Sequence, residues 1–424
     1  MSEWKEEILD NLVVVDPEQL SSSTNEDFTF FYIDISSVSE GHIDYPASQI
    51  KFKGSPSRAR KTLKFNDVLM STVRPNLKSF AKFNRESKFN FVASTGFAIL
   101  RAKQEIDIDF IYHNLFSENV ERQIQTLVVG SNYPAINSSD VKKLIFNVPD
   151  YKTQRKIARI LSTADAVIGK TQAAIAKYKA IKQGMMNDLF IRGIDPATGK
   201  LRPTYEDALE LYKDSKLGWV PKEWEEKPLE IYSTQIGDGI HTTPKYSENT
   251  DYYFVNGNNL SEGQIEIGDT ALCVSEVEYK KHFKELNERT ILYSINGTIG
   301  NIALYKNEKI ILGKSACYIS CKHNVNLDFI YFFLQSFQVN KFYENELTGS
   351  TINNLSLASV RNTPITIPKS NKEQELIANR IRTITNKLQT EQTYLHKLQQ
   401  IKAGLMADLL SGKKKVNVDE EPVN

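Results

Sequence analysis

Side chains that could contact nucleic acid gather in a few short polar stretches. Residues 74–84, RPNLKSFAKFN, combine the cations Arg74, Lys78 and Lys82 with the aromatic residues Phe80 and Phe83. Guanidinium and ammonium groups hold phosphates or pair with guanine edges, and only the phosphate contact is independent of sequence. We expect this stretch to form a loop after a strand. Its pattern fits a DNA contact, and it also fits an ordinary solvated charged loop.

Two stretches in the second half carry different polar groups. NGTIGN offers Asn296 and Asn301, whose amides could pair with adenine, although Asn beside Gly is also typical of turns. DGIHTTPKY supplies His241, Thr242 and Lys245, which could bind a phosphate or a base edge. A polar surface loop explains the same residues, so both interpretations stay open.

A further pair of loops precedes the last strand of each half. GSNYPAIN contains Asn132 and Tyr133, and GSTINNLS contains Thr351 and Asn353. Small polar residues suit close approach to a DNA backbone or groove, and loops on a rigid scaffold often carry function. Their spacing does not separate base readout from turn geometry.

The motifs of common DNA-modifying and nucleotide-hydrolysing enzymes are missing from the sequence. There is no G-x-x-x-x-G-K-[ST] loop for nucleotide hydrolysis and no G-x-G-x-x-G for a dinucleotide cofactor. The chain has no Pro-Pro pair, and therefore no Asn-Pro-Pro-aromatic or Asp-Pro-Pro-aromatic tetrapeptide of amino-methyltransferases. We expect no catalytic residue, no metal and no bound cofactor in this chain.

Two weaker patterns suggest alternatives. Cys317, Cys321 and His323 in ACYISCKH could ligate zinc, but a strand would place both thiols on one face as small core groups, which is the simpler interpretation.

Asp269 followed by Glu278 and Lys280 loosely resembles the acid, acid-x-lysine set of magnesium-dependent nucleases. The first half lacks this set, and its spacing arises easily in a charged protein. A nuclease acting alone is nevertheless retained as an alternative function.

An internal duplication organises these stretches. The tetrapeptide DFIY occurs at 109–112 and again at 328–331, ISSVSEGHI matches GNNLSEGQI, and VLMS matches ILYS, each displaced by about 220 residues. Each half begins with short alternating or β-branched runs punctuated by Gly, Pro, Asn and Ser, which predicts a β-rich globular domain. These parts end at Pro149 and Pro368.

After each proline the apolar residues recur every three or four positions, which predicts a long helix with one apolar stripe. The two stripes match residue for residue at a displacement of 220 and both lapse at Thr171 and Glu391. A helix of 35 to 40 residues would extend roughly 55 Å. We expect the two helices to pack on each other in antiparallel fashion, although packing of each on its own globular half is the alternative. The predicted seam comprises Ile157, Leu161, Ile168, Ile175, Tyr178, Ile377, Ile381, Leu388, Leu395 and Leu398.

Composition sets limits on the class of protein. The chain has 424 residues, 40% hydrophobic and 25% charged content, and a net charge of +1, which neither supports nor excludes DNA binding. No run of about 18 apolar residues predicts a membrane span, and the N-terminus lacks the features of a signal peptide. Three cysteines make no obvious disulfide framework. We therefore expect a cytoplasmic protein.

The order of β-rich domain, long helix, β-rich domain, long helix resembles the specificity subunits of type I restriction-modification enzymes. The resemblance covers essentially the whole chain and rests on the duplicated arrangement together with these segments: STGFAILRAK, QRKIARIL, IKQGMMNDLF, LGWVPKEW, DGIHTTPKY and IKAGLMADLLSGK.

The resemblance implies an α+β fold in which two target-recognition domains are joined by an antiparallel coiled coil that docks two methyltransferase subunits. Restriction/translocase subunits would complete the complex, and S-adenosylmethionine, ATP and magnesium would bind to the partners. The expected ranges are 1–149 and 216–368 for the recognition domains, 150–192 and 369–411 for the helices, 193–215 for a linker and 412–424 for a disordered tail.

The resulting hypothesis is a non-catalytic subunit that recognises an asymmetric bipartite target in double-stranded DNA. Two domains on a rigid spacer should read two short tracts separated by an unread gap, and diverged halves should read different tracts. A coiled-coil assembly scaffold without a DNA role is a second alternative.

Overall fold

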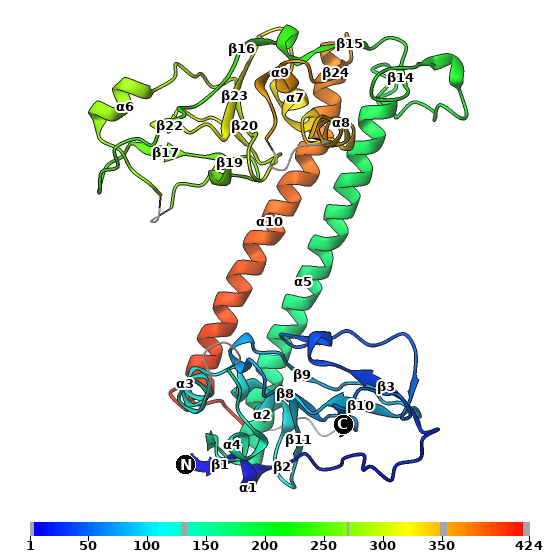
Figure 1. Ribbon diagram of the computed structural model, residues 1–424, viewed down its shortest axis with the longest axis vertical. Helices are drawn as coiled ribbons and strands as arrows, with labels where there is room; N and C mark the ends of the chain where they lie inside the picture. The colour runs from blue at the N-terminus through cyan, green and yellow to red at the C-terminus, as the bar shows by residue number, and fades with distance from the viewer. Residues whose placement is uncertain (1–3, 129–133, 269–270, 348–353, 419–424) are drawn as a thin grey trace. The chain divides into compact units, whose positions relative to one another are not determined.

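The protein forms two compact units in a computed structural model that describes residues 4–128, 134–268, 271–347 and 354–418. Unit 1 comprises Met1–Ala173 and Gln392–Asn424, and unit 2 comprises Ala174–Glu391. Figure 1 shows that each unit combines a globular part with segments of the two longest helices, α5 (Tyr151–Arg192) and α10 (Asn371–Leu409).

Unit 1 is built on two four-stranded sheets. One has the order β2-β11-β8-β9 and the other the order β6-β3-β10-β7. Strands β1 and β12 form an antiparallel pair, and so do β4 and β5. The strand bounds are β1 Lys5–Ile8, β2 Val13–Val15, β3 Thr29–Ile33, β4 Val38–Ser39, β5 His42–Ile43, β6 Ile50–Lys51, β7 Ala59–Thr62, β8 Val68–Ser71, β9 Phe80–Lys82, β10 Phe91–Ser94, β11 Phe97–Ala102 and β12 Ile145–Val148.

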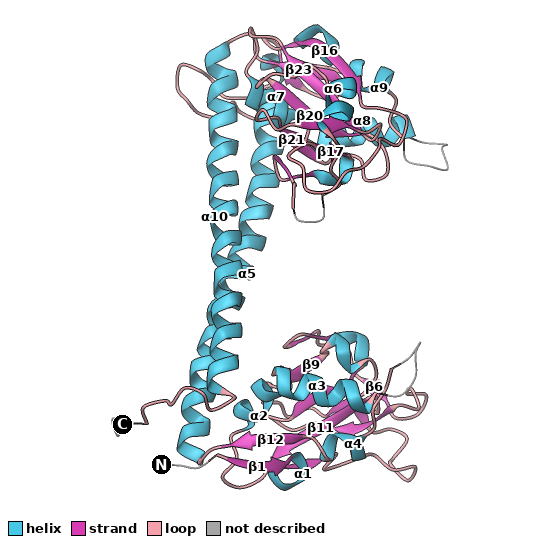
Figure 2. Ribbon diagram, turned by 90° about the vertical axis from the view of Figure 1, so that its left-hand side faces the viewer, coloured by secondary structure: helices cyan, strands magenta, loops and turns pink. Residues whose placement is uncertain are grey.

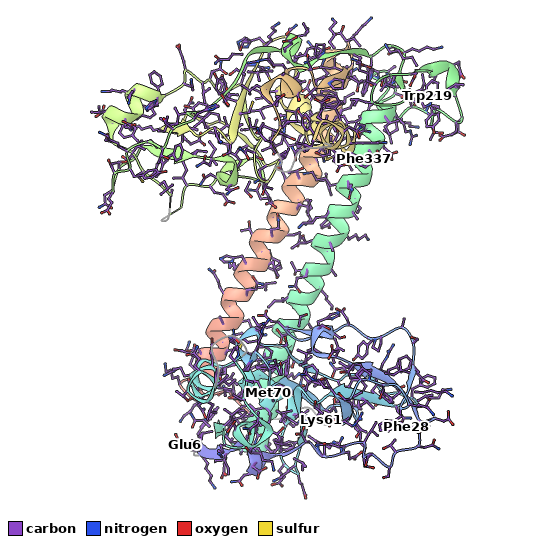
Figure 3. All side chains as sticks on the ribbon, viewed as in Figure 1. Glu6, Phe28, Lys61, Met70, Trp219 and Phe337 are labelled. Atoms are coloured by element: carbon purple, nitrogen blue, oxygen red, sulfur yellow. The ribbon has the colours of Figure 1, made fainter. Side chains whose placement is uncertain are left out.

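Alternation along β8 explains how the layers of unit 1 stack. Val68 and Met70 (labelled in Figure 3) join a core with helices α2 and α3, whereas Leu69 on the opposite face joins a core with the second sheet. Figure 2 shows these helices beside the strands of unit 1. The short helical elements are α1 Leu9–Leu12, η1 Ile35–Ser37, η2 Pro75–Leu77, α2 Ile108–Leu115, α3 Glu118–Leu127 and α4 Ser138–Lys142.

Unit 2 has the same plan in its main sheet, with the order β16-β23-β20-β21. The parallel pair β17 and β22 corresponds to β3 and β10 of unit 1, and the antiparallel pair β15 and β24 corresponds to β1 and β12. The strand bounds are β13 Tyr212–Lys213, β14 Val220–Pro221, β15 Glu225–Pro228, β16 Ser233–Asp238, β17 Tyr253–Val255, β18 Leu260–Ser261, β19 Gln264–Ile265, β20 Thr290–Ser294, β21 Ile302–Leu304, β22 Ile310–Leu312, β23 Ala316–Cys321 and β24 Pro364–Ile367.

The helices of unit 2 follow the order found in unit 1. Helices α7, α8 and α9 take the places of α2, α3 and α4, whereas α6 has no counterpart among the described residues of unit 1. The bounds are η3 Leu209–Leu211, η4 Leu229–Tyr232, η5 Gly257–Asn259, α6 Glu276–His282, α7 Leu327–Phe333, α8 Phe337–Leu347 and α9 Leu357–Arg361. The predicted duplicated α+β fold is thus confirmed.

The repeated tetrapeptide DFIY is explained by its packing. In each unit it lies in the helix that follows the main sheet, and its Phe and Ile are fully buried. Its tyrosine meets the glycine of the repeated SEG segment. A Cβ added to Gly41 would lie 2.8 Å from the Tyr112 hydroxyl, and one added to Gly263 would lie 2.7 Å from the Tyr331 hydroxyl. Both glycines have positive φ, so two repeated motifs require each other in each unit.

A repeated glutamine locks each long helix to its own globular part. Gln154 of α5 donates from Nε2 to the Pro149 carbonyl (2.9 Å) and accepts at Oε1 from the Asp107 backbone N–H (3.0 Å). Gln374 of α10 makes the same two bonds, to the Pro368 carbonyl (2.8 Å) and from the Asn326 backbone N–H (2.9 Å). Both glutamines are buried, and each fixes the residue that caps the DFIY helix.

The long helices run antiparallel within each unit. In unit 1 Asp165 of α5 pairs with Lys402 of α10 (2.5 Å), and Ile157 and Leu161 share a core with Leu409. In unit 2 the α5 residues Met186, Leu189 and Phe190 share a core with the α10 residues Ile377 and Ile381. Residue numbers rise along one helix as they fall along the other.

The predicted seam is therefore composite. Ile157, Leu161, Ile377 and Ile381 belong to the globular cores of their units, which is the packing expected from the alternative interpretation. The other predicted seam residues lie along the middle of the two long helices. Of these, Ile175 and Leu388 are buried, and those half-buried are Ile168, Tyr178, Leu395 and Leu398. The ammonium of Lys387 lies 5.8 Å from the Tyr178 ring centroid.

The segment predicted as a linker, 193–215, packs as part of unit 2. Arg202 is buried and holds the Glu373 carboxylate through Nη1 (2.5 Å) and Nη2 (3.0 Å). Glu373 also accepts from the Ile194 backbone N–H (2.9 Å) and from Trp224 Nε1 (3.2 Å). A Cβ at Gly193 would collide with Glu373, which explains the glycine after α5. Burial opposes the charge of Arg202, but its bonds to Glu373 prevail and raise its pKa.

The tail predicted as disordered from Gly412 stays packed for several residues. Gly412 has positive φ and lies against Trp4, Lys414 pairs with Asp408 (2.9 Å), and Val416 packs on the core of unit 1. Residues beyond 418 lie outside the described part of the chain. Within that part, the helices are too short or too polar to cross a membrane.

Candidate nucleic-acid interface

Two of the predicted loops lie side by side in each unit. In unit 1 the turn after β8 is joined to the segment before α4 by a bridge between Val73 and Ala135, and Arg74 N–H donates to the Pro134 carbonyl (2.7 Å). In unit 2 the turn after β20 is joined to the segment before α9 by a bridge between Asn296 and Asn354. We call residues 72–78 with 134–136, and residues 295–301 with 354–355, the paired turns.

The paired turns share an equivalent bridge and one left-handed position but carry different side chains. Aligning VLMS with ILYS places Arg74 opposite Gly297, and both have positive φ (49° and 75°). Left-handed backbone costs a residue other than glycine about 1 to 2 kcal/mol. Unit 2 meets this requirement with glycine, whereas unit 1 keeps an arginine. Strained residues cluster at functional sites, so Arg74, which stands where unit 2 has glycine, stays a candidate for DNA contact.

The other basic residues of the first stretch take part in the fold. Lys78 also has positive φ and pairs with Glu121 of α3 (3.0 Å). Lys82 lies on β9 rather than on a loop and forms an ion pair with Asp109 of α2. Phe80 and Phe83, predicted to alternate with these cations at a surface, are both buried. The stretch is therefore a turn after β8 that continues into strand β9, rather than one loop. A phosphate at Lys78 or Lys82 would have to compete with a carboxylate, and contact of these lysines with DNA stays a prediction.

The two asparagines of unit 2 have different surroundings. Asn301 donates from Nδ2 to the Gly257 carbonyl (3.2 Å), and its backbone N–H donates to Ser294 Oγ (2.9 Å), so its amide supports the turn. Asn296 is half-buried at the bridge to Asn354. The side chain of Asn296 is therefore the better placed of the two for a base edge.

The His241 loop follows β16. His241 Nε2 lies 2.9 Å from the Asp238 carboxylate, and Thr242 and Lys245 are exposed. A Cβ at Gly239 would lie 1.9 Å from the Leu312 carbonyl oxygen, so the loop begins with a close backbone approach that fixes its direction. This loop presents a cation and two polar groups on one exposed segment.

Four predicted residues, Asn132, Tyr133, Thr351 and Asn353, lie outside the described residues. The segments that contain them adjoin Pro134 and Asn354 in the chain, next to the paired turns.

The two weaker patterns have structural explanations. Cys317 and Cys321 both belong to the core of unit 2, as the strand interpretation predicted, and burial raises the pKa of the Cys321 thiol to about 12. Glu278 and Lys280 lie on α6 and pair with His282 and Glu276. Asp269 lies outside the described residues, and across the described ranges no three His, Cys, Asp or Glu side chains gather as a metal site.

Sequence reasoning missed a cationic and aromatic cluster in unit 1. The guanidinium of Arg85 lies 4.7 Å from the Tyr45 ring centroid and 5.9 Å from that of Phe91, and the exposed Phe89 packs on Phe31. Aromatic faces and arginine planes are suited to stacking on bases or sugars. The sequence NRESKF carried a weak signal, but Tyr45 is forty residues away.

A buried histidine was also missed. His113 of α2 is 1% exposed, and its Nε2 lies 3.0 Å from Ser162 Oγ on α5. Burial lowers its pKa to about 3, and the charges of Lys402 and Lys82 act in the same direction. The Asp165 carboxylate, 3.7 Å from Nδ1, is too distant for a hydrogen bond and is held by Lys402, so it does not offset burial. His113 is therefore a neutral core group.

Comparison with known proteins agrees with this architecture. The family model of the type I restriction modification DNA specificity domain matches residues 11–177 and 221–402. The putative type I restriction enzyme MjaX specificity subunit of Methanocaldococcus jannaschii is 23% identical over 427 residues, covering 98% of this chain and 94% of its own. The MjaVIII specificity subunit of the same organism is also 23% identical, over 78% of this chain and 75% of its own.

Solved structures share the fold. The type I restriction-modification S subunit from M. genitalium superposes with a TM-score of 0.59 at 16% identity, covering 96% of both chains. A chain from a study of complex assembly and conformational transition of the type I R-M system gives 0.52 at 18% identity, covering 96% of this chain and 97% of that one. Because the family model matches most of the sequence, the chain belongs to the type I restriction-modification DNA specificity family, as a non-catalytic specificity subunit that recognises a DNA target.

Proposed function

We propose that the two units read two different short tracts of one double-stranded DNA target, separated by base pairs that are not read. The observation that carries this proposal is the duplication of the paired turns on equivalent scaffolds with different side chains, Arg74 in unit 1 and Asn296 beside Gly297 in unit 2. Equivalent scaffolds favour one mode of approach to DNA, and different side chains favour different bases. The target would then be bipartite and asymmetric.

The DNA contacts in this proposal come from both units. In unit 1 Arg74 pairs with a base edge or a phosphate, and the Arg85 and Phe89 cluster adds stacking or backbone contact. In unit 2 Asn296 faces a base edge, and the His241 loop with Lys245 holds the backbone. The remaining predicted residues, Asn132, Tyr133, Thr351 and Asn353, stay candidates because they adjoin the paired turns in the sequence.

The long helices would set the gap between the tracts and dock two methyltransferase subunits. Ile181 and Ile401, equivalent positions displaced by 220, are 39% and 48% exposed, which suits contact with the same partner at both sites. Restriction/translocase subunits would join the complex. S-adenosylmethionine, ATP and magnesium would bind to these partners, and the assembly would act on DNA in the cytoplasm.

The direct test is to co-express the chain with a methyltransferase subunit of its system, purify the complex and map methylated adenines by single-molecule sequencing. The expected result is an asymmetric bipartite motif that disappears when this chain is omitted. A stable complex without a motif would contradict DNA recognition and support the scaffold alternative. If no complex forms, magnesium-dependent cleavage by the chain alone becomes the test of the nuclease alternative.

The role of the helices has a separate test. Inserting four residues, about one helical turn, into α5 should lengthen the unread gap or prevent assembly. An unchanged motif in a variant of unchanged stability would contradict the spacer role.

A further inference from the structure

A basic groove lies on unit 1 between the first turns of α5, the start of α2 and the end of the described tail. Its volume is about 1110 Å³. Its charged lining consists of Asp107 and Asp109 beside Lys152, Arg155, Lys156 and Arg159.

Four of the lining residues are cations on one face of α5. Lys152, Arg155, Lys156 and Arg159 are spaced by three, one and three residues, which aligns their side chains along the helix, and all four are exposed. The two acidic lining residues are already engaged, because Asp107 caps α2 through the Phe110 backbone N–H (3.0 Å) and Asp109 pairs with Lys82. The groove therefore carries excess positive charge.

These cations are expected to destabilise the start of α5. Apart from Asp150, which precedes α5 and accepts from the Thr153 backbone N–H (3.1 Å), no acidic residue stands at this end of the helix, where the helix dipole favours negative charge. Like charges three and four residues apart destabilise a helix by a few tenths of a kcal/mol per pair. Lys152, Lys156 and Arg159 form no ion pair with any carboxylate in the described part of the chain. Among the described residues, folding thus gives no reason for the charges of Lys152, Lys156 and Arg159.

Unit 2 lacks the row. The positions displaced by 220 are Lys372, Glu375, Leu376 and Asn379, so one cation remains of four and one position is acidic. A partner subunit that docked alike on both units would need the same charges on both. The difference between the units favours a ligand of unit 1 alone.

We propose that this groove binds the phosphate backbone of duplex DNA beside the tract read by unit 1, without regard to its sequence. The inference rests on the proposed recognition of DNA and adds a contact outside the paired turns. Lys152 to Arg159 spans about 10 Å along the helix axis at ~1.5 Å per residue. One DNA strand carries a phosphate every ~3.4 Å of duplex axis, so a strand lying along this face would meet about three phosphates.

The test compares two charge-matched variants of the complex with the methyltransferase subunit. One carries K152Q, K156Q and R159Q. The control carries K170Q, K177Q and K179Q, which removes three exposed lysines of the same helix outside the groove. Binding to a duplex with the mapped target and to an unrelated duplex is measured over a range of salt concentrations.

In the groove variant we expect both affinities to fall by the same factor, about tenfold to a hundredfold at 0.1 M salt. The slope of log affinity against log salt should become shallower by about 2 to 3, since each phosphate contact contributes about 0.9. The methylated motif should stay the same, and the control should bind like the parent.

Three results would overturn the inference. Unchanged affinity and salt slope in the groove variant would exclude a phosphate contact, and an equal loss in the control would mean a general effect of charge. Loss of the methyltransferase subunit from the groove variant alone would mean that the groove docks an acidic face of that partner. If the parent complex itself has no preference for any target, the proposed function fails instead.

Discussion

The two units show which features of the shared scaffold are fixed and which vary. Gln154 and Gln374 make equivalent pairs of hydrogen bonds, and Gly41 and Gly263 each meet the tyrosine of their own DFIY segment. The surfaces differ, because the turn that holds Arg74 in unit 1 holds Gly297 in unit 2. The contacts at the starts of the two long helices also differ. Glu373 anchors the start of α10 through a buried arginine, and the equivalent position in α5 is Thr153. Conservation of the frame with divergence at the turns is what two readers of different DNA tracts require.

The largest difference between the units should come from the buried ion pair. Replacing Arg202 by Ala leaves the Glu373 carboxylate buried without its charge partner, which we expect to destabilise unit 2 by about 3 to 5 kcal/mol. The matched change in unit 1, T153A, removes one hydrogen bond to Asp150 and should cost about 1 kcal/mol. Hydrogen exchange with mass spectrometry measures the stability of each unit separately. Similar losses of stability from the two substitutions would contradict this difference between the starts of α10 and α5.

The glutamine locks should behave alike. Q154A and Q374A each remove two buried hydrogen bonds and leave a carbonyl and a backbone N–H unsatisfied, so each should lower the stability of its own unit by about 2 to 3 kcal/mol. Urea denaturation followed by hydrogen exchange gives both values. If the losses of stability in the two units differ by more than about 1 kcal/mol, the two glutamines are not equivalent.

Substitution of Arg74 should affect the stability of unit 1 and the binding of DNA differently. R74G relieves the left-handed backbone, worth about 1 kcal/mol, but also removes the interactions of the arginine side chain, so the stability of unit 1 should change by less than about 1 kcal/mol. Binding of the target should fall by about 1 to 3 kcal/mol, with relaxed preference in one tract only. The control G297A places a side chain at the equivalent position, where space is open, and should cost about 1 kcal/mol of stability through φ alone. A destabilised R74G that still selects the same bases would assign Arg74 a purely structural role.

His113 provides the smallest and most specific contrast, because Phe332 occupies the equivalent position in unit 2. The pKa of His113 is lowered in the folded state, so its neutral form is required there. The associated stability is fully present above pH 6.5 and is lost as pH falls from 6.5 toward 3, by about 1.4 kcal/mol per pH unit at most. H113F should remove this pH dependence from unit 1, as measured by denaturation at pH 7 and pH 5. A variant with the parent's slope between these values would place the titrating group elsewhere.

Much of the frame could be predicted from sequence because it is periodic or repeated. The stripes of the long helices, the closing prolines and the DFIY repeat all reflect burial, which recurs wherever the scaffold recurs. The ordered segment around Arg202 could not be predicted, since its charge partner Glu373 is 171 residues away. Composition alone suggested a polar linker there.

The candidate site was harder to predict than the frame. Arg74, Lys78 and Lys82 look alike in sequence, but carboxylates on α3 and α2 pair with the two lysines, and those pairings depend on tertiary packing. The paired turns could not be found from spacing either, because about sixty residues separate Val73 from Ala135. The only local signal was the alignment of Arg74 with a glycine, which became informative once both backbones had positive φ.

The proposed function requires that each unit reads its own tract. The most direct measurement replaces residues 1–149 with the corresponding region of another family member of known target and maps the methylated motif of the hybrid complex. We expect one tract to change to that of the donor, while the other tract and the length of the gap remain. A motif in which both tracts change, or in which neither does although the hybrid complex is assembled and active, would contradict it.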